Sequence, residues 1–244
     1  MGLDVAFHLA RCGAKVFLAG IDKNLNQKAG EQAKSEGLDI TVSEVDVSDT
    51  ASVAAWKEKI ASRTNSLHAL VNAAGIQTYG TVETTTPDQW DKTIAVNLRS
   101  CYLTTHFLYP LLKAAQGADI LHISSLQGHA NQNNVLAYAT TKGGIHALTR
   151  AMAVDCATDK IRVNSISPGS VRTPLLEFSA RELATDGKTE EDMIAEFGAS
   201  HPVGRVGTTA EVSALVAFLC SDSAEFITGS DLLIDGGLMA QLGV

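Results

Sequence analysis

The chain has 244 residues, of which 45% are hydrophobic and 19% charged, a composition typical of one large globular domain rather than of a disordered or fibrous protein. Its net charge of −8, without any Lys/Arg cluster, argues against nucleic acid or an anionic membrane as a partner. No apolar run is long enough to span a bilayer, and we expect no secretory signal at the start.

Four cysteines are scattered along the chain, and none forms a C-x-x-C pair: Cys12, Cys101, Cys156 and Cys220. Most have apolar neighbours, so we expect buried free thiols and a reducing, cytoplasmic compartment. A zinc site would need closely spaced Cys/His pairs, which His8 and Cys12 alone do not provide. No metal site is therefore predicted.

Apolar periodicity and turn residues predict alternating helices and strands. The predicted helices cover residues 3–12, 22–36, 50–63, 87–115, a stretch that carries residue 138 and continues to about 156, and a stretch from about 209. The predicted strands cover residues 14–19, 40–45, 67–71, 118–123, 161–166 and 231–235. This alternation indicates one α/β domain, residues 1–244, with a parallel sheet covered by helices on both faces. Pro110 is expected to bend the long helix.

The most informative stretch is S-S-L-Q-G-H-A-N-Q-N-N-V-L-A-Y-A-T-T-K, residues 124–142. Tyr138 and Lys142 are four residues apart, so a helix places them on one face. Ser125 follows a buried strand, at the sheet edge where α/β proteins bind ligands. A phenol has a pKa of about 10, and a nearby ammonium group lowers it toward neutrality. Y-x-x-x-K alone is common in ordinary helices, but the serine and its strand favour catalysis.

Together with N-A-A-G at 72–75, V-N-L at 96–98 and P-G-S-V-R-T-P at 168–174, this stretch resembles the short-chain dehydrogenase/reductase family over nearly the whole chain. The resemblance implies a Rossmann-like, doubly wound fold and a nicotinamide-dependent oxidoreductase. It makes Tyr138 the general acid/base, Lys142 its activator and a contact of the nicotinamide ribose, and Ser125 the residue that orients the carbonyl. Asn97 would hold a water in a proton relay to Lys142, with a structural hydrogen bond as the alternative.

The start of the chain departs from the family pattern. The family's first strand and its T-G-x-x-x-G-x-G turn have no counterpart, and only Gly2 matches, at the last glycine of that motif. The absent strand would lie between the strands predicted at 14–19 and 67–71, and the turn would supply backbone contacts to the pyrophosphate. Three explanations stay open: an incomplete sequence, which we favour, a short form that fills the gap differently, or a non-catalytic relative.

By resemblance, residues at the strand ends bind the dinucleotide. Asp22 would lie near the adenosine ribose, where a carboxylate repels the phosphate of NADP, so we lean to NAD over NADP. Gly20 and Ile21 stand where the family's usual NAD acid and NADP arginine would be. Helix caps and plain turns are the alternatives for several of these positions. The other expected contacts are Gly2 as the remaining glycine of the pyrophosphate-binding turn, Asp46 at the adenine with Val47 beside it, Asn72, Ala73 and Gly75 at a ribose or adenine, Tyr138 and Lys142 at the nicotinamide ribose, and Pro168, Gly169, Val171 and Thr173 at the nicotinamide.

The loop between Ser125 and the catalytic helix is polar. Ser125, Gln127 and His129, with Gln77 from the neighbouring loop, are expected to bind the substrate. Such donors and acceptors favour a sugar, a sugar acid or another polyol over a steroid or an acyl chain, unless the amides simply face solvent. A role of His129 as a second acid or as a metal ligand stays open as a remote alternative.

The sequence therefore predicts hydride transfer between a nicotinamide cofactor and the alcohol or carbonyl of a small polar substrate, with Tyr138 moving the proton. A 3-oxoacyl-thioester reductase and a cofactor-free, non-catalytic relative are the alternatives. By resemblance, the polar residues 175–204 would form a substrate lid, and the C-terminal pattern would pack a homotetramer.

Overall fold

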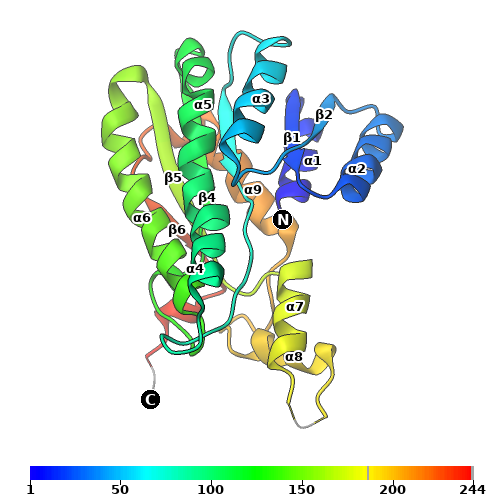
Figure 1. The fold of residues 1–244 in the computed structure, drawn as a ribbon, viewed down its shortest axis with the longest axis vertical. Helices are drawn as coiled ribbons and strands as arrows, with labels where there is room; N and C mark the ends of the chain where they lie inside the picture. Colours follow the sequence, from blue (N-terminus) through cyan, green and yellow to red (C-terminus); the bar gives the residue numbers. More distant parts are fainter. Residues whose placement is uncertain (186, 243–244) are drawn as a thin grey trace.

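Parallel strands form the centre of the protein, and helices pack on both faces of them (Figure 1), as the sequence predicted. The computed structural model describes residues 1–185 and 187–242, so Asp186 of the predicted lid and residues 243–244 of the predicted domain lie outside it. The strands are β1 (Val16–Gly20), β2 (Ile40–Glu44), β3 (Ala69–Asn72), β4 (Ala118–Ile123), β5 (Ile161–Pro168) and β6 (Asp231–Ile234).

The helices follow the predicted order closely. They are α1 (Gly2–Arg11), α2 (Lys23–Ser35), α3 (Thr50–Ala61), α4 (Pro87–Ile94), α5 (Ser100–Ala114), α6 (Leu136–Cys156), α7 (Pro174–Leu183), α8 (Glu190–Ala199) and α9 (Thr209–Leu219). Apolar side chains of α3, α5 and α6 pack on one face of the strands, and those of α1 and α9 pack on the other. The parallel strands are thus buried by helices, as this class of sheet requires.

The strands divide into two sheets. β1 pairs with β2, and β3, β4, β5 and β6 form a second sheet in that order, with every pairing parallel. Among the described residues no hydrogen-bonded ladder joins β1 to β3. All five residues of β1 are only half-buried, whereas all six of β4 are buried. The sheet is therefore interrupted at the position where the sequence lacks the family's first strand.

Helix α1 connects the two sheets through its side chains. Val5, 2% exposed, packs with Val71 and Leu121 of the larger sheet. Phe7, 3% exposed, packs with Leu18 and Val42 of the β1–β2 pair. Residues two apart on a helix point about 200° apart, so α1 contacts both sheets at once. Hydrophobic contact replaces strand pairing across this interruption.

Side-chain caps fix where several helices begin. The Asp22 carboxylate accepts a hydrogen bond of 2.9 Å from the Leu25 amide at the start of α2. Asp49 caps α3 by accepting from the Ser52 amide at 2.8 Å. Such a cap contributes about 1 kcal/mol. The Asp22 carboxylate, which was expected to contact a ribose, thus already has a hydrogen-bond partner in its own helix.

The long helix predicted for residues 87–115 is interrupted. Residues Ala95–Arg99 form a π-helical segment between α4 and α5, and α5 continues through Pro110 to Ala114. Asn97 lies at the centre of this segment and is fully buried. π-Helical turns arise where a side chain has a tertiary role that a regular helix would misplace. The local sequence, which favours helix throughout, does not reveal this interruption.

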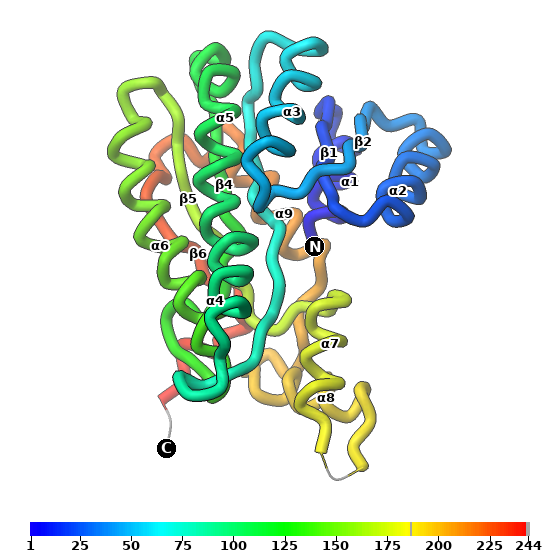
Figure 2. Tube along the Cα trace, viewed as in Figure 1, coloured from blue at the N-terminus to red at the C-terminus, as the bar shows by residue number. Residues whose placement is uncertain are grey.

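Helices α7 and α8 form a separate lobe below the carboxyl ends of β4 and β5 (Figures 1 and 2). Met193 and Ile194 of α8 pack on Ala180 of α7, which gives the lobe a small apolar core of its own. The lobe corresponds to the segment predicted as a lid. Of the residues that the structure describes, no helix is both long and apolar enough to cross a bilayer.

All four cysteines are free thiols. Cys101 and Cys156 are buried, as predicted, whereas Cys12 is exposed and Cys220 is half-buried. The expectation that all four are buried is thus wrong for Cys12 and Cys220. Cys12 is exposed because it follows α1 on the solvent side of that helix.

Candidate active site

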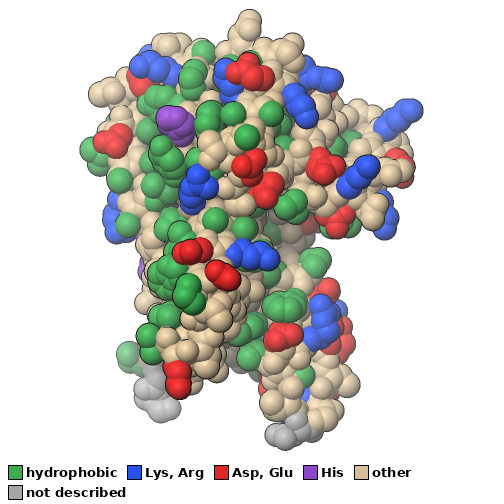
Figure 3. All heavy atoms as spheres, in the orientation of Figure 1, with side chains coloured by type: hydrophobic (Ala, Val, Ile, Leu, Met, Phe, Trp, Pro, Cys, Tyr) green, Lys and Arg blue, Asp and Glu red, His purple; other side chains and the backbone are tan. Residues whose placement is uncertain are grey.

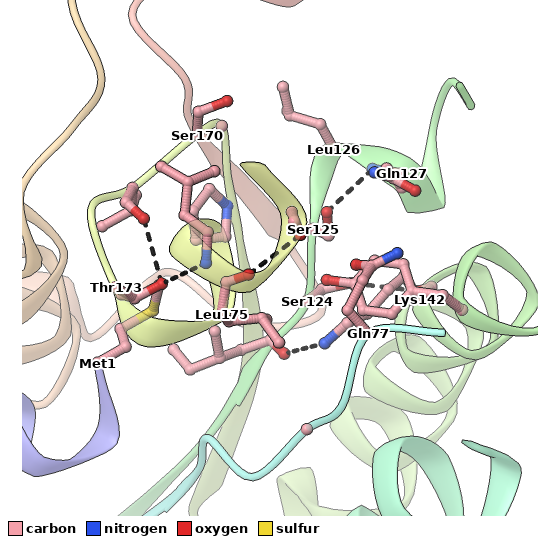
Figure 4. Close-up of a pocket in the computed structure, with 18 of the residues that line it drawn as sticks. Met1, Gln77, Ser124, Ser125, Leu126, Gln127, Lys142, Ser170, Thr173 and Leu175 are labelled. Atoms are coloured by element: carbon pink, nitrogen blue, oxygen red, sulfur yellow. Dashed lines mark hydrogen bonds between the residues drawn. The ribbon is translucent and has the colours of Figure 1, made fainter. Parts of the chain in front are cut away.

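A cavity of about 440 Å³ opens between the carboxyl ends of the larger sheet and the α7–α8 lobe. Figure 3 shows the hollow that separates this lobe from the main body, and Figure 4 shows the residues around the cavity. Its walls come from the ends of β3, β4 and β5, from α6 and α7, and from the first two residues of the chain. Open α/β sheets bind their ligands at this edge.

Tyr138 lies in the first turn of α6 and lines the cavity while only 7% of its surface is exposed. Burial raises the pKa of its phenol, and a hydrogen bond with Ser125 lowers it in part. Lys142 was expected to lower this pKa, but in this structure Ser125 is the group that does so. A buried phenol with a raised pKa is protonated at neutral pH and suits proton donation to a carbonyl oxygen.

Lys142 lies one helical turn after Tyr138 and is 5% exposed. Its ammonium nitrogen donates a hydrogen bond of 2.9 Å to the carbonyl oxygen of Ile123 and lies 5.4 Å from the centre of the Tyr138 ring. Burial lowers the pKa of Lys142 to about 8, and the nearby Cys101 thiol counteracts this in part. The side chain is therefore held in place by the last residue of β4 and remains mainly charged at neutral pH.

Ser125 follows β4 and begins a short 3-10 turn. Its hydroxyl oxygen accepts a hydrogen bond of 3.2 Å from the Gln127 amide, which orients the side chain. The extended backbone of Ser125 and the turn after it place this hydroxyl at the cavity wall (Figure 4). The hydroxyl is also close enough to Tyr138 to act on its phenol. Ser125, Tyr138 and Lys142, which the sequence separates by up to 17 residues, therefore meet at one end of the cavity.

Asn97 stands behind this group rather than in the cavity wall. Its side-chain oxygen accepts from the Ile76 amide at 2.8 Å, and its side-chain nitrogen donates to the Ile76 carbonyl at 2.9 Å and to the Thr141 hydroxyl at 3.3 Å. The structural hydrogen bonds considered for Asn97 are thus present. The oxygen lies 3.5 Å from a Cβ built on Gly75, and Lys142 lies 3.9 Å from the same point. Asn97 thereby fixes the loop after β3 against the catalytic helix.

The cavity gathers all four residues expected at the nicotinamide, but only some of those expected at the phosphate, ribose or adenine. Gly2, Ala73, Gly75, Pro168, Gly169, Val171 and Thr173 line it. Asp22, Asp46, Val47 and Asn72 are not among its lining residues. Asp46 accepts from the amide and hydroxyl of Ser48, and Asn72 accepts from the Thr104 hydroxyl at 2.7 Å. These side chains support the backbone at the strand ends.

The nicotinamide half of a dinucleotide fits the residues that are present. A side chain at Gly169 would come within 2.6 Å of the His201 ring and 3.1 Å of the Asp235 Cα, so glycine lets this part of the cavity wall pack closely on both. The N-terminus of α1 also reaches the cavity through Met1 and Gly2, and helix N-termini bind phosphate groups. When bound, a nicotinamide supplies hydride chemistry.

Several residues around the cavity were not found by sequence reasoning. His201, 3% exposed, accepts a hydrogen bond of 3.1 Å from the Ser170 amide and positions the turn after β5. An apolar wall faces the polar one, made of Leu126, Leu175, Leu176, Leu183 and Phe197. The spacing of the α7 leucines, three of them on about two turns, was the available signal for that wall. His201 had no local signal, because its role depends on a tertiary contact.

His129, expected to bind the substrate, is not among the lining residues. Its Nε2 atom instead lies 2.6 Å from the Asp231 carboxylate at the start of β6. Gln77 and Gln127, the other two amides expected at the substrate, do line the cavity, together with Gln132. Of the four residues expected at the substrate, Ser125 and these two glutamines thus line the cavity, and His129 does not.

Comparisons with known proteins agree with this geometry. The sequence model of a family described as enoyl-(acyl carrier protein) reductase matches residues 1–239. Trans-4-hydroxycyclohexanecarboxylate dehydrogenase of Sinomonas cyclohexanicum is 37% identical over 97% of this chain and 88% of its own length. The chain belongs to the short-chain dehydrogenase/reductase family.

Two further proteins that are similar to this chain are also named as dehydrogenases. Cyclopentanol dehydrogenase of Comamonas is 35% identical over 98% of this chain and 93% of its own length. The crystal structure of ligand-free aldohexose dehydrogenase from Thermoplasma acidophilum superimposes with a TM-score of 0.81 at 31% identity, covering 94% of this chain and 95% of that one. The family, the Rossmann-like fold and the oxidoreductase class predicted from the sequence are thus confirmed, with a nicotinamide cofactor implied.

Proposed function

We propose that this protein transfers a hydride between a nicotinamide dinucleotide and the carbon of a secondary alcohol or ketone in a small cyclic substrate that carries polar groups. The observation that supports this most directly is the convergence of Ser125, Tyr138 and Lys142 at one end of a cavity of about 440 Å³. The volume lies within the range usual for small-molecule sites.

The three side chains divide the work on the substrate oxygen. In the reducing direction the Tyr138 phenol donates its proton to the carbonyl oxygen, and the Ser125 hydroxyl donates a hydrogen bond that holds this oxygen in place. The Lys142 ammonium stabilises the phenolate that remains, because an opposite charge nearby favours the ionised form. In the oxidising direction the same phenolate accepts the proton of the alcohol. Asn97 holds the loop that follows β3 against helix α6, next to these three side chains.

The two walls of the cavity suggest a ring with one apolar and one polar face. Leu175, Leu176 and Phe197 offer contact to carbon atoms, while Gln77 and Gln127 offer hydrogen bonds to hydroxyl or carboxylate groups. The three relatives described above are named for a hydroxycyclohexane carboxylate, cyclopentanol and aldohexoses. A five- or six-membered ring with polar substituents agrees with both the walls and these names, and it refines the sugar-like substrate that the sequence suggested.

NAD is the proposed cofactor. Asp22 is exposed at the end of β1 beside Ile21, which is 68% exposed, and no arginine follows the strand within this turn. A carboxylate at this position disfavours the extra phosphate of NADP. Because Asp22 also caps α2, the discrimination is expected to be modest.

We further propose that α7 and α8 move over the bound substrate as a lid. Leu175, Leu176, Ser179 and Leu183 of α7 already line the cavity, and the lobe has its own small core, so it can shift as a unit. Closure would exclude water from the site where the hydride moves.

The quaternary structure is proposed to be a homotetramer. Large apolar side chains remain exposed on the helical faces and near the C-terminal strand: Tyr102 at 49%, Val154 at 77%, Phe218 at 42% and Phe226 at 103%. Exposed apolar patches of this kind indicate a surface covered by another chain. Light scattering coupled to gel filtration measures the mass directly, and a monomer of 25.7 kDa would contradict the proposal.

The function is tested by titrating the purified protein with NADH and NADPH and then assaying oxidation of cyclopentanol, cyclohexanol, trans-4-hydroxycyclohexanecarboxylate and aldohexoses. We expect micromolar binding of NADH, weaker binding of NADPH, and turnover of at least one ring alcohol. A 3-oxoacyl thioester is included, because the matching family model is described by an acyl-carrier reductase. Turnover of the thioester alone would favour that alternative.

The cofactor-free alternative gives a different result in the same titration. The interruption between β1 and β3 removes backbone amides from the place where a pyrophosphate would be bound, so a non-catalytic relative would bind neither nucleotide. Intact mass, measured on that sample, establishes which chain was tested. If a sample with an intact mass of 25.7 kDa binds neither NADH nor NADPH, the proposed function is contradicted.

A further inference from the structure

Three side chains that the proposed reaction does not use meet beside the start of β6. They are His129 from the loop after β4, His146 from the middle of α6, and Asp231, the first residue of β6. The His129 Nε2 atom lies 2.6 Å from Oδ2 of Asp231, and the His146 Nε2 atom lies 3.5 Å from Oδ1 of the same carboxylate. The two imidazole rings are nearly stacked, with centroids 4.3 Å apart. Segments distant in sequence thus direct two nitrogens and two oxygens at one point.

Serine hydroxyl groups hold two of these three side chains. Ser165 and Ser167 of β5 both donate hydrogen bonds to Oδ1 of Asp231. The His146 Nε2 atom lies 2.8 Å from the Ser124 hydroxyl and 3.0 Å from the Ser167 hydroxyl. The bonds to Oδ1 orient the carboxylate and leave Oδ2 free to bind an ion, whereas an ion on Nε2 of His146 would displace the hydroxyl contacts of that nitrogen. The buried part of the cluster is therefore built before any ion arrives.

The cluster is closed on one side and open on the other. The side chains of His146 and Asp231 are 6% and 12% exposed, whereas that of His129 is 37% exposed. An ion can reach the cluster past His129, and a water molecule can complete its coordination there. A site with three protein ligands and one open position is a common arrangement for zinc.

We propose that His129, His146 and Asp231 form a binding site for a divalent transition-metal ion, with Zn²⁺ the best match. One donor atom of each residue lies within 4.8 Å of the others. Zinc binds imidazole nitrogen and carboxylate oxygen at about 2.0–2.2 Å, which for a tetrahedral ion separates the donors by about 3.3 Å. That separation falls between the 2.6 Å of the closest pair and the 4.8 Å limit, so small side-chain rotations suffice.

The donor set selects among metals. Two imidazoles and one carboxylate suit Zn²⁺, Ni²⁺ or Cu²⁺, whereas Ca²⁺ and Mg²⁺ require six or more oxygen donors or an octahedral shell of water. The sequence predicted no metal site, because residues 129, 146 and 231 show no ligand spacing along the chain. Only the fold brings them together.

An ion at this site would fasten the loop after β4 to β6. That loop carries Ser125 and Gln127 at its start, and Ser124, which now contacts His146, directly precedes Ser125. Binding is therefore expected to stabilise the folded protein in proportion to the logarithm of the free metal concentration. This expectation is independent of the nicotinamide chemistry, so the site can be tested even if the enzyme proposal fails.

The test uses the full chain without a histidine tag, freed of metals with a chelator that is then removed. Calorimetric titration with ZnCl₂ is expected to show one ion per chain, and CoCl₂ is expected to give the intense visible absorption of a tetrahedral Co²⁺ site. In His129→Gln the affinity for Zn²⁺ is expected to fall at least about 10-fold. His68→Gln, at an exposed histidine outside the cluster, serves as the matched control and should bind as the wild type does.

Two results would overturn the proposal. One is the absence of saturable Zn²⁺ binding by the wild type; the other is unchanged affinity in His129→Gln, which would locate the ion elsewhere on the chain. Asp231→Asn is a third variant, expected to abolish the Co²⁺ absorption. Because Asp231 is largely buried, the circular dichroism of the Asp231→Asn variant is first compared with that of the wild type. If this variant does not fold, the result at the exposed position 129 decides the question.

Discussion

The ammonium nitrogen of Lys142 lies 5.4 Å from the centroid of the Tyr138 ring, and both side chains are almost fully buried. A spacing of four residues on α6 is the cause, since it aligns side chains on one face of a helix. Placing a cation and a phenol together without water costs desolvation free energy, which the surrounding structure must offset. A site that accepts such a cost for two titratable groups is typical of catalysis.

Replacing Tyr138 by Phe tests the proton transfer. The phenyl ring fills the same volume, so the fold is retained, but no proton can be donated to the substrate oxygen. We expect kcat to fall by about 10²–10⁴-fold, the usual contribution of general acid–base catalysis. Steady-state kinetics measure this fall, with whichever ring alcohol the substrate assay shows to be turned over. Tyr102→Phe, at an exposed tyrosine on α5, is the control and should leave kcat unchanged.

Lys142 gives a pH dependence of stability with a defined sign. Its pKa of about 8 in the folded protein lies below the 10.5 of the unfolded chain. Between these values the unfolded state binds more protons, so this group makes the free energy of unfolding rise with pH, by up to about 3 kcal/mol. Below pH 8 both states are protonated and the cost of burying the charge is fully present.

The measurement is a urea titration of the wild type and of Lys142→Met from pH 7 to 10.5. Other buried groups titrate in this range, and the difference between the two proteins isolates residue 142. We expect Lys142→Met to remove the rise assigned to Lys142 and to lose catalytic activity at every pH. A difference that stays constant across the range would show that the ammonium is not desolvated in the folded protein.

Much of this architecture could be predicted from the sequence. The strand at 118–123 was placed with its final bounds, because a short apolar run between turn residues has few other interpretations. The expected gap between residues 14–19 and 67–71 appears as the interruption between β1 and β3. The convergence of Ser125, Tyr138 and Lys142 also follows from local spacing plus the rule that ligands bind at strand ends.

The failures have a common cause in tertiary contacts. The π-helical segment at Asn97 depends on bonds to Ile76, 21 residues away, and no periodicity reports such a partner. His129 was expected at the substrate but meets Asp231, 102 residues later. Asp22 caps its own helix, a role that the sequence always allows for an aspartate before a helix, and its contact with a ribose stays a prediction.

Gly128 is predicted to be intolerant of a side chain. A Cβ at this position would lie 2.3 Å from Cε1 of the His146 ring, which several hydrogen bonds hold in place. Gly128→Ala is expected to destabilise the protein by about 1–3 kcal/mol through overpacking. Gly117→Ala, where nothing lies within 4 Å, should change stability by no more than about 0.5 kcal/mol. Equal melting temperatures for the two variants would disprove this packing argument.

Asn97→Ala is predicted to loosen the loop after β3. The amide and carbonyl of Ile76 each lose their partner, and a buried polar group without one costs about 1–3 kcal/mol. Faster hydrogen exchange at the Ile76 amide and a lower free energy of unfolding are the expected results. Asn24→Ala, at an exposed asparagine on α2, should leave both unchanged.

The interruption of the sheet predicts unequal local stability. Within residues 1–185 and 187–242, β1 and β2 pair with each other and with no further strand, and they join the rest of the protein through side chains such as Phe7. Opening this unit therefore breaks fewer interactions than opening β4 and β5, which are flanked by paired strands on both sides. Native-state hydrogen exchange should show the amides of β1 and β2 opening at a lower free energy than those of β4 and β5.

Phe7→Ala should widen this difference. Removing a buried phenyl ring costs about 3–5 kcal/mol, and because Phe7 packs on Leu18 and Val42, the loss falls on the contact between α1 and the β1–β2 pair. Exchange in β1 and β2 is expected to accelerate far more than exchange in β4. Val82→Ala, at a side chain that is 86% exposed, provides the control. Uniform acceleration in all four strands would mean that the two sheets open together, and that side-chain packing across the interruption is as cooperative as a continuous ladder.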